Sequence, residues 1–175
     1  NIAGQADLND CFMVVRGPLG ELYVSNGYGG VREVLADGTT RLYSQGAAPG
    51  QHPTAIGIDL HPDGRVYLAE ARPAGTSQFP GAISSLDAQG IAQVEVFDPG
   101  LLPAPQDIAF APNGNLLVAN FAQYNPGNEA PRLVRIRSNG TAQVLVDGAP
   151  LIKPKGIAVN SRGNVVIADT DAKAL

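Results

Sequence analysis

The sequence contains no tryptophan, one cysteine, one methionine and two histidines, and aromatic residues make up only 6% of it. The single cysteine, Cys11, excludes an internal disulfide and a zinc site built from cysteines. No run of about 18 apolar residues is present, so we expect no membrane-spanning helix and no membrane partner. The chain begins with Asn and shows no basic leader, but this start is uninformative, because a chain without an initiator Met can already be processed or trimmed. The location stays undetermined, with a secreted or periplasmic one favoured over a cytoplasmic one.

Positive charge is also scarce, because 12 Lys and Arg residues stand against 16 Asp and Glu residues and the net charge is −4. The one basic stretch, residues 132–137, alternates with apolar residues as the solvated outer face of a strand does. We therefore expect no nucleic acid as a partner. The sequence also lacks a Gly-x-Ser-x-Gly elbow, a His-Glu-x-x-His helix and a phosphate-binding glycine loop, so no catalytic residue is predicted from such motifs.

Glycine and proline are abundant, with 21 and 14 residues, and the glycines mark an internal repeat. Each of four segments places a short apolar run before a glycine and a second apolar run after it. The four glycines are Gly20, Gly64, Gly114 and Gly163, at spacings of 44, 50 and 49 residues. A period of about 40–50 residues built from short β-type runs is typical of propeller blades. The two runs are expected to form the first two strands, A and B, of each blade.

Two more alternating runs, the expected strands C and D, follow the A–B unit in the first three repeats, with Gly-containing hairpin links between them. The predicted fold is therefore all-β: a β-propeller of four-stranded antiparallel blades, with about three and a half blades present in a single partial domain over residues 1–175. The blades are expected at about 11–46, 55–98 and 105–147, with half of a fourth at about 154–175.

An open arc of blades leaves an apolar face uncovered at each end, because each repeat buries its faces only against its neighbours. We therefore expect one of two arrangements. Either the chain is a fragment of a larger ring, or two copies associate as a homo-oligomer that completes the ring.

The repeats resemble known propeller families. The pattern P-x-G-I-A-V-x-x-x-G-N-V-V-I-A-D at 154–169 resembles the NHL repeat, whereas residues 55–70 and 105–120 resemble the regucalcin/gluconolactonase group. The resemblance covers nearly the whole chain and implies a ring that closes with six blades. It does not imply one activity, because this scaffold carries lactonases, lyases and pure interaction platforms.

The gluconolactonase resemblance also implies a metal site, and the residues at the expected ligand positions show whether this chain could form it. Those enzymes hold a divalent metal, often calcium, with Glu, Asn and Asp placed just before the first hydrophobic residues of several A strands. The equivalent residues here are Phe12, Ile56, Gln106 and Lys155. Calcium requires several converging oxygen ligands, but only Gln106 supplies one, and Asp107 beside it is a single carboxylate. We predict no metal ligands and no cofactor, with a divalent cation such as calcium as the alternative.

A second set of polar residues ends the B strands, each six residues after the turn glycine: Asn26, Glu70, Asn120 and Asp169. They are expected on the face where the A strands begin. One interpretation is a polar rim that binds a sugar, a lactone or a cation. The other is that Asn and Asp terminate strands there and bond loop amides.

The loops between strands B and C differ in length. Blade 1 has only residues 27–30, whereas blades 2 and 3 have 71–81 and 121–131. Long insertions on one face of a repeat protein often form its binding face, and surface loops that merely tolerate insertion are the alternative. These loops carry the aromatic residues Phe79, Phe121 and Tyr124.

The functional hypothesis is a recognition module that binds a small polar ligand or a protein partner on the B–C-loop face. The ligand-binding residues are predicted to be Asn26, Glu70, Phe79, Asp107, Asn120, Phe121, Tyr124 and Asp169. The centre of the site is expected between blades 2 and 3, where Glu70 and Asn120 occupy the same register. The alternative is a metal-dependent hydrolase of the gluconolactonase type, whose metal would polarise the lactone carbonyl.

Overall fold

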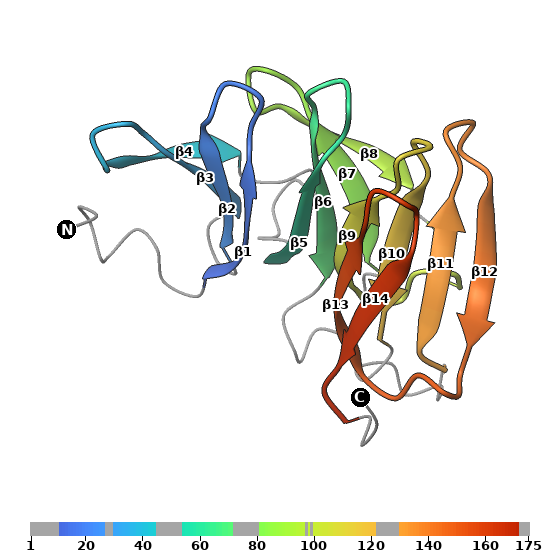
Figure 1. The fold of residues 1–175 in the computed structure, drawn as a ribbon. Coiled ribbons are helices and arrows are strands. Elements are labelled where there is room, and N and C mark those ends of the chain that lie inside the picture. Colours follow the sequence, from blue (N-terminus) through green and yellow to red (C-terminus); the bar gives the residue numbers. More distant parts are fainter. Residues whose placement is uncertain are drawn as a thin grey trace.

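The computed structural model describes residues 11–26, 30–44, 54–71, 81–96, 98, 100–121 and 130–171. All regular structure in these ranges is β, with 14 strands and no helix, and hence no helix that could span a membrane. The strands form three four-stranded antiparallel sheets and one two-stranded sheet, which stand side by side around a common axis (Figure 1).

Each sheet is one blade, and its strands pair in the order in which they occur in the chain. Blade 1 comprises β1 (Cys11–Arg16), β2 (Leu22–Asn26), β3 (Gly30–Val34) and β4 (Thr40–Ser44). Blade 2 comprises β5 (Thr54–Leu60), β6 (Val66–Ala71), β7 (Ala82–Leu86) and β8 (Ala92–Val96). Blade 3 comprises β9 (Pro105–Phe110), β10 (Leu116–Asn120), β11 (Arg132–Ile136) and β12 (Ala142–Asp147). The hairpin of β13 (Pro154–Val159) and β14 (Val165–Asp169) belongs to a fourth blade. The predicted partial propeller of four-stranded blades is confirmed.

The repeat glycines sit in the A–B turns, where they have a structural reason to be glycine. All four adopt a positive φ, between +78° and +98°, a conformation that other residues rarely adopt. In the turn of blade 2, the Gly64 amide donates to the His61 carbonyl at 2.9 Å, and Gly114 makes the same bond to Ala111 in blade 3. The sequence period therefore reflects one turn geometry used four times.

The core consists of three apolar layers, each between two neighbouring blades. Side chains alternate along a strand, so adjacent residues of one B strand belong to different layers. On β6, Leu68 packs toward blade 1 and Ala69 toward blade 3, and both are 0% exposed. A blade in the middle of the arc is thus buried on both faces.

The outer faces of the two terminal blades are not covered by any described residue. On blade 1, Phe12 and Val14 are 49% and 62% exposed, and they alternate with residues that pack against blade 2. On the hairpin, Val166 is 66% exposed, whereas its neighbour Ile167 packs against blade 3. The expected apolar ends of the arc are therefore present.

Candidate functional site

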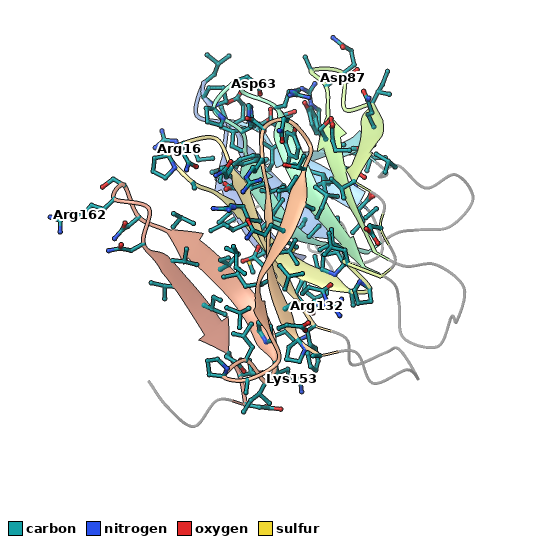
Figure 2. All side chains as sticks on the ribbon, turned by 90° about the vertical axis from the view of Figure 1, so that its right-hand side faces the viewer. Arg16, Asp63, Asp87, Arg132, Lys153 and Arg162 are labelled. Atoms are coloured by element: carbon teal, nitrogen blue, oxygen red, sulfur yellow. The ribbon has the colours of Figure 1, made fainter. Side chains whose placement is uncertain are left out.

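The candidate face lies at the end of the blades where the A strands begin and the B strands end. Figure 2 shows Lys153 and Arg132 at this end, and Asp63 and Asp87, which belong to the A–B and C–D turns of blade 2, at the opposite end. The B–C loops leave from the first end. Most of their residues, including Phe79 and Tyr124, lie outside the described ranges.

Three of the four residues that end the B strands, Asn26, Glu70 and Asn120, are buried, whereas Asp169 is partly buried. The structure gives several of the four a structural partner. Asn120, which is 0% exposed, accepts a hydrogen bond from the Ala104 amide at 2.9 Å through Oδ1. Asp169 accepts from the amides of Ile152 and Lys153 at 2.7 and 2.8 Å. In both blades the side chain therefore ties the end of strand B to the segment that leads into strand A, as the loop-amide interpretation expects.

Glu70 has a different partner, although its register is the same. The Ser84 hydroxyl on β7 donates to Glu70 Oε2 at 2.6 Å, and Glu70 is only 4% exposed. On β6, Glu70 points to the same face as Leu68, into the layer between blades 1 and 2. On β10, Asn120 points to the same face as Val118, into the layer between blades 2 and 3. The two side chains thus belong to different layers. Asn26, at the same position in blade 1, is 5% exposed.

The inner strands carry two carboxylates that link one blade to the next, the buried Asp107 and the partly buried Asp59. Asp107 Oδ2 accepts from the Ile157 amide of β13 at 2.8 Å. Asp59 Oδ2 on β5 accepts from the Phe110 amide of β9 at 2.7 Å. Each carboxylate also accepts, through Oδ1, from the amide of the next residue in its own strand. Sequence reasoning missed Asp59, and an acidic residue inside an otherwise apolar A strand was the signal for it.

Burial governs the ionisation of these two carboxyl groups. It raises the pKa of Asp107 to about 6, despite the two amide hydrogen bonds, and the charge of Asp59 adds to the rise. Burial also raises the pKa of Asp59. The close approach of the strands requires a glycine, because a Cβ on Gly57 would lie 2.6 Å from the Asp107 Cα. The main role of the Asp107 side chain is thus to link blade 3 to blade 4 through its hydrogen bond with the Ile157 amide.

A cluster of four side chains, Gln106, Phe121, Lys153 and Lys155, occupies the candidate face between blade 3 and the β13–β14 hairpin. We call it the lysine cluster. The Lys155 ammonium donates to Gln106 Oε1 at 2.5 Å and lies 5.4 Å from the centre of the Phe121 ring. The Lys153 ammonium lies 5.8 Å from the same ring. Both distances are in the range of cation–π attraction.

The residues around the cluster hold it in place. Gln106, 3% exposed, donates through Nε2 to the Ala104 carbonyl at 3.1 Å, and the Phe121 amide donates to that carbonyl at the same distance. The same Ala104 residue is held through its amide by Asn120, whose buried Nδ2 has no hydrogen-bond partner among the described residues. The predicted residues Asn120 and Phe121 are therefore brought together with Gln106, around one peptide segment.

Charge is unevenly compensated within the lysine cluster. Lys153 pairs with Asp171 at 3.7 Å. Lys155 has no carboxylate partner among the described residues, and its hydrogen-bond partner is the neutral amide of Gln106. Burial, and then the charge of Lys153, lower the pKa of Lys155. A partly buried ammonium without a counter-ion is unusual and is a marker of functional sites.

The inner strands also line a concave cavity of about 540 Å³ along the propeller axis. Most of the residues that line it are apolar, and Asp59 and Asp107 are its carboxylates. The described residues do not fit a calcium ion. Both oxygens of Asp107 accept from amides, Gln106 Oε1 faces an ammonium, and no three His, Cys, Asp or Glu side chains of the described ranges gather as metal ligands.

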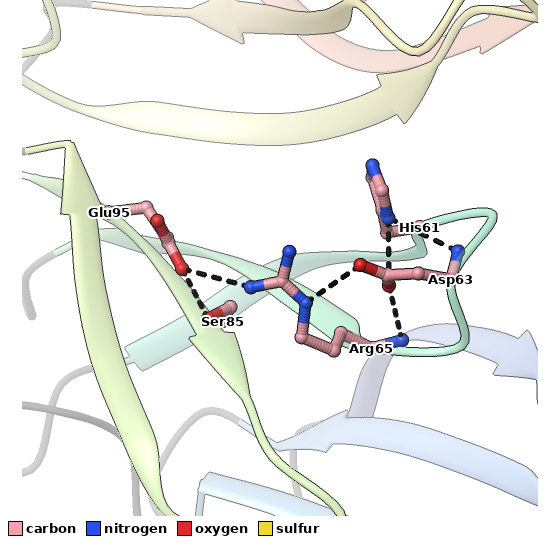
Figure 3. Close-up of polar contacts among 5 residues, drawn as sticks. All are labelled: His61, Asp63, Arg65, Ser85 and Glu95. Carbon is pink, nitrogen blue, oxygen red and sulfur yellow. Dashed lines mark hydrogen bonds and ion pairs between the residues drawn. The ribbon is translucent and has the colours of Figure 1, made fainter. Parts of the chain in front are cut away.

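A second polar network lies on the opposite face, in blade 2 (Figure 3). His61 Nδ1 is 2.7 Å from Asp63 Oδ1, Arg65 bonds Asp63 at 2.9 Å, and Glu95 accepts from Arg65 and from the Ser85 hydroxyl. Burial opposes ionisation of Asp63, but the bonds from Arg65 and His61 prevail and its pKa falls to about 2. This network links the A–B turn to the outer strands of blade 2, and it contributes nothing to the lysine cluster.

Comparison with known proteins finds similarity at the level of structure. No family model and no curated protein sequence matches the chain. A gluconolactonase from Xanthomonas campestris superposes with a TM-score of 0.71 at 15% identity, over 91% of this chain and 56% of that one. Virginiamycin B lyase from Staphylococcus aureus gives a TM-score of 0.68 at 16% identity, over 91% and 48%.

A third similar structure is the extracellular domain of a one-component system from B. thetaiotaomicron, with a TM-score of 0.63 at 11% identity, over 91% of this chain and 20% of that one. The chain spans about half the length of the gluconolactonase and the lyase. Identities this low show the fold and not the activity. In fold, the chain is an arc of a β-propeller of the kind that the gluconolactonases share.

Proposed function

We propose that this propeller arc is a recognition module that binds a small polar ligand on the B–C-loop face, at the lysine cluster. The observation that carries the proposal is Lys155. Its ammonium is partly buried, is oriented by Gln106, lies against the Phe121 ring and lacks a carboxylate partner among the described residues. A few oriented polar groups beside an aromatic ring are the usual composition of a small-ligand site.

The proposed centre lies one interblade layer further along the chain than the sequence predicted. Glu70 accepts a hydrogen bond from Ser84, and Asn120 and Asp169 accept from backbone amides. These side chains therefore stabilise the face, and we do not assign them ligand contacts. Phe121 and the two lysines, in contrast, direct functional groups toward one another at the surface. Asn120 acts through the Ala104 segment that positions Gln106 and Phe121.

The second candidate function is a metal-dependent lactonase, and the structural similarity to a gluconolactonase favours it. For this function the metal would need ligands from outside the described residues, because Lys155 and Gln106 stand where the resemblance places two of them. We rank it below ligand recognition for that reason. We also propose a secreted or periplasmic location, which the similarity to an extracellular domain supports; cell fractionation with an antibody to the chain would test it.

The test of ligand recognition is a titration followed by ¹H–¹⁵N NMR. The probes are two acid–neutral pairs with matched skeletons, benzoate with benzamide and gluconate with sorbitol. We expect at least one probe to produce saturable shifts at the amides of Gln106, Phe121 and Lys155. Phe121→Ala should weaken that binding by about tenfold or more, the usual loss for an aromatic contact at a binding site.

The control is Ile91→Ala, which removes an exposed apolar side chain (66% exposed) from the C–D link of blade 2 and should leave binding unchanged. If no probe gives a saturable shift, or if the shifts persist in Phe121→Ala, the lysine cluster is not a ligand site.

A further inference from the structure

The charges around the lysine cluster define the kind of ligand it fits. Lys153 and Asp171 form an ion pair at 3.7 Å, so their charges largely offset one another. Both carboxylate oxygens of Asp169 accept from backbone amides, those of Ile152 and Lys153. The Asp107 carboxyl bonds the amides of Ile108 and Ile157. None of these carboxylates bonds Lys155, so its positive charge has no bonded counter-ion among the described residues.

The geometry around Lys155 leaves its ammonium able to bind an anion. An ammonium has three N–H donors. One N–H donor of the Lys155 ammonium bonds Gln106, and the ammonium also lies against the Phe121 ring. Gln106 is fixed by the Ala104 carbonyl, so it holds the Lys155 chain in one position. A fixed and partly desolvated ammonium attracts an anion more strongly than a solvated surface lysine does.

We propose, on the basis of the recognition function above, that the lysine cluster binds the carboxylate of a small monoanionic ligand, with Lys155 as its counter-ion and Phe121 against the ligand body. A single positive charge that no described carboxylate bonds matches a monoanion. A phosphate dianion would bring a second negative charge to a face that also carries the carboxylates of Asp169 and Asp171, and like charges disfavour one another. The exposed part of the Phe121 ring then contacts the apolar or planar portion of the ligand.

The experiment compares the acid and the neutral member of each probe pair, by the same NMR titration at low ionic strength. We expect benzoate to bind about 10- to 100-fold more tightly than benzamide, which corresponds to the value of a charge-assisted hydrogen bond. Added salt should reduce the difference, because it screens the charge. Equal affinity for the two members of each pair would overturn the carboxylate assignment, yet the recognition function would stand. Absence of binding by all four probes would overturn both.

Variants separate charge from packing. Lys155→Gln should lower the affinity for benzoate to that for benzamide, and Lys155→Arg, which keeps the charge, should preserve the preference for the acid. Lys153→Gln should cost only about 2- to 5-fold, because Lys153 is paired with Asp171 and a partly exposed ion pair contributes little. Arg162→Gln, in the A–B turn of the same hairpin, removes a charge at the other end of the strands and serves as the matched control (Figure 2).

Two further results would contradict the proposal. One is a Lys155→Gln variant that is folded by circular dichroism and retains the full preference for benzoate over benzamide. The other is inorganic phosphate that displaces benzoate and binds more tightly, which would assign the site to phosphate-bearing ligands instead.

Discussion

The buried Asp107 carboxyl should make the stability of the fold depend on pH in a predictable direction. Its pKa rises from 3.8 to about 6 on folding, because burial penalises the charged form. Below about pH 3 the group is protonated in both the folded and the unfolded chain. Between pH 4 and 6 the unfolded chain releases its proton first, so the folded state becomes less stable as pH rises.

The size of the effect follows from the shift. A difference of about 2 pKa units corresponds to about 3 kcal/mol of unfolding free energy at 1.36 kcal/mol per unit. Asp107 is 5% exposed, so solvent screening reduces this little. Asp59, whose pKa is also raised by burial, adds to the loss in the same direction. Other carboxyl groups contribute to the total, and a variant is therefore needed to isolate the Asp107 part.

Asp107→Asn keeps the shape of the carboxyl but cannot ionise. We expect its unfolding free energy to change by about 3 kcal/mol less between pH 3 and 7 than that of the unmodified chain. Urea unfolding followed by tyrosine fluorescence at several pH values would measure this difference. Asp37→Asn, which alters an exposed turn carboxylate bonded to Thr39, is the control and should not remove the slope. Identical pH profiles for Asp107→Asn and the unmodified chain would refute the reasoning.

Three other predictions concern packing, metal and assembly. Gly57→Ala should lower the unfolding free energy by about 1–3 kcal/mol, because the new Cβ meets the Asp107 backbone. Gly156→Ala, at the same register of β13, should be tolerated, because the nearest atom to its new Cβ would lie 3.5 Å away. Urea unfolding of both variants checks this. Millimolar calcium should leave Tm unchanged, and a rise of several degrees that chelator reverses would restore the metal-lactonase candidate. The uncovered outer faces should make the chain self-associate, and Val166→Lys should reduce this association; light scattering that shows a stable 18.1 kDa monomer would contradict the prediction.

Local signals in the sequence predicted the blades well. A turn glycine with a positive φ, followed by a run of alternating apolar residues, needs no distant partner to be recognised, and Gly20, Gly64, Gly114 and Gly163 all occupy such turns. The same register identified the ends of the B strands, where Asn120 and Asp169 bond the segments that lead into the A strands. It could not tell that Glu70, at the same position, would be held by a serine across the sheet.

The sequence by itself thus determined the order and pairing of the strands, because turns and strand periodicity are encoded within a few neighbouring residues. Only the tertiary structure decided the partners that the propeller brings together from one repeat and the next. Asp59 meets the Phe110 amide across 51 residues, Asp107 the Ile157 amide across 50, and Lys155 meets Gln106 across 49. Each separation is one repeat, so the bonds depend on how two blades pack. The register placed Gln106 and Lys155 at equivalent positions, but the packing alone joined them and left the Lys155 ammonium without a carboxylate partner in the part of the chain that the structure describes.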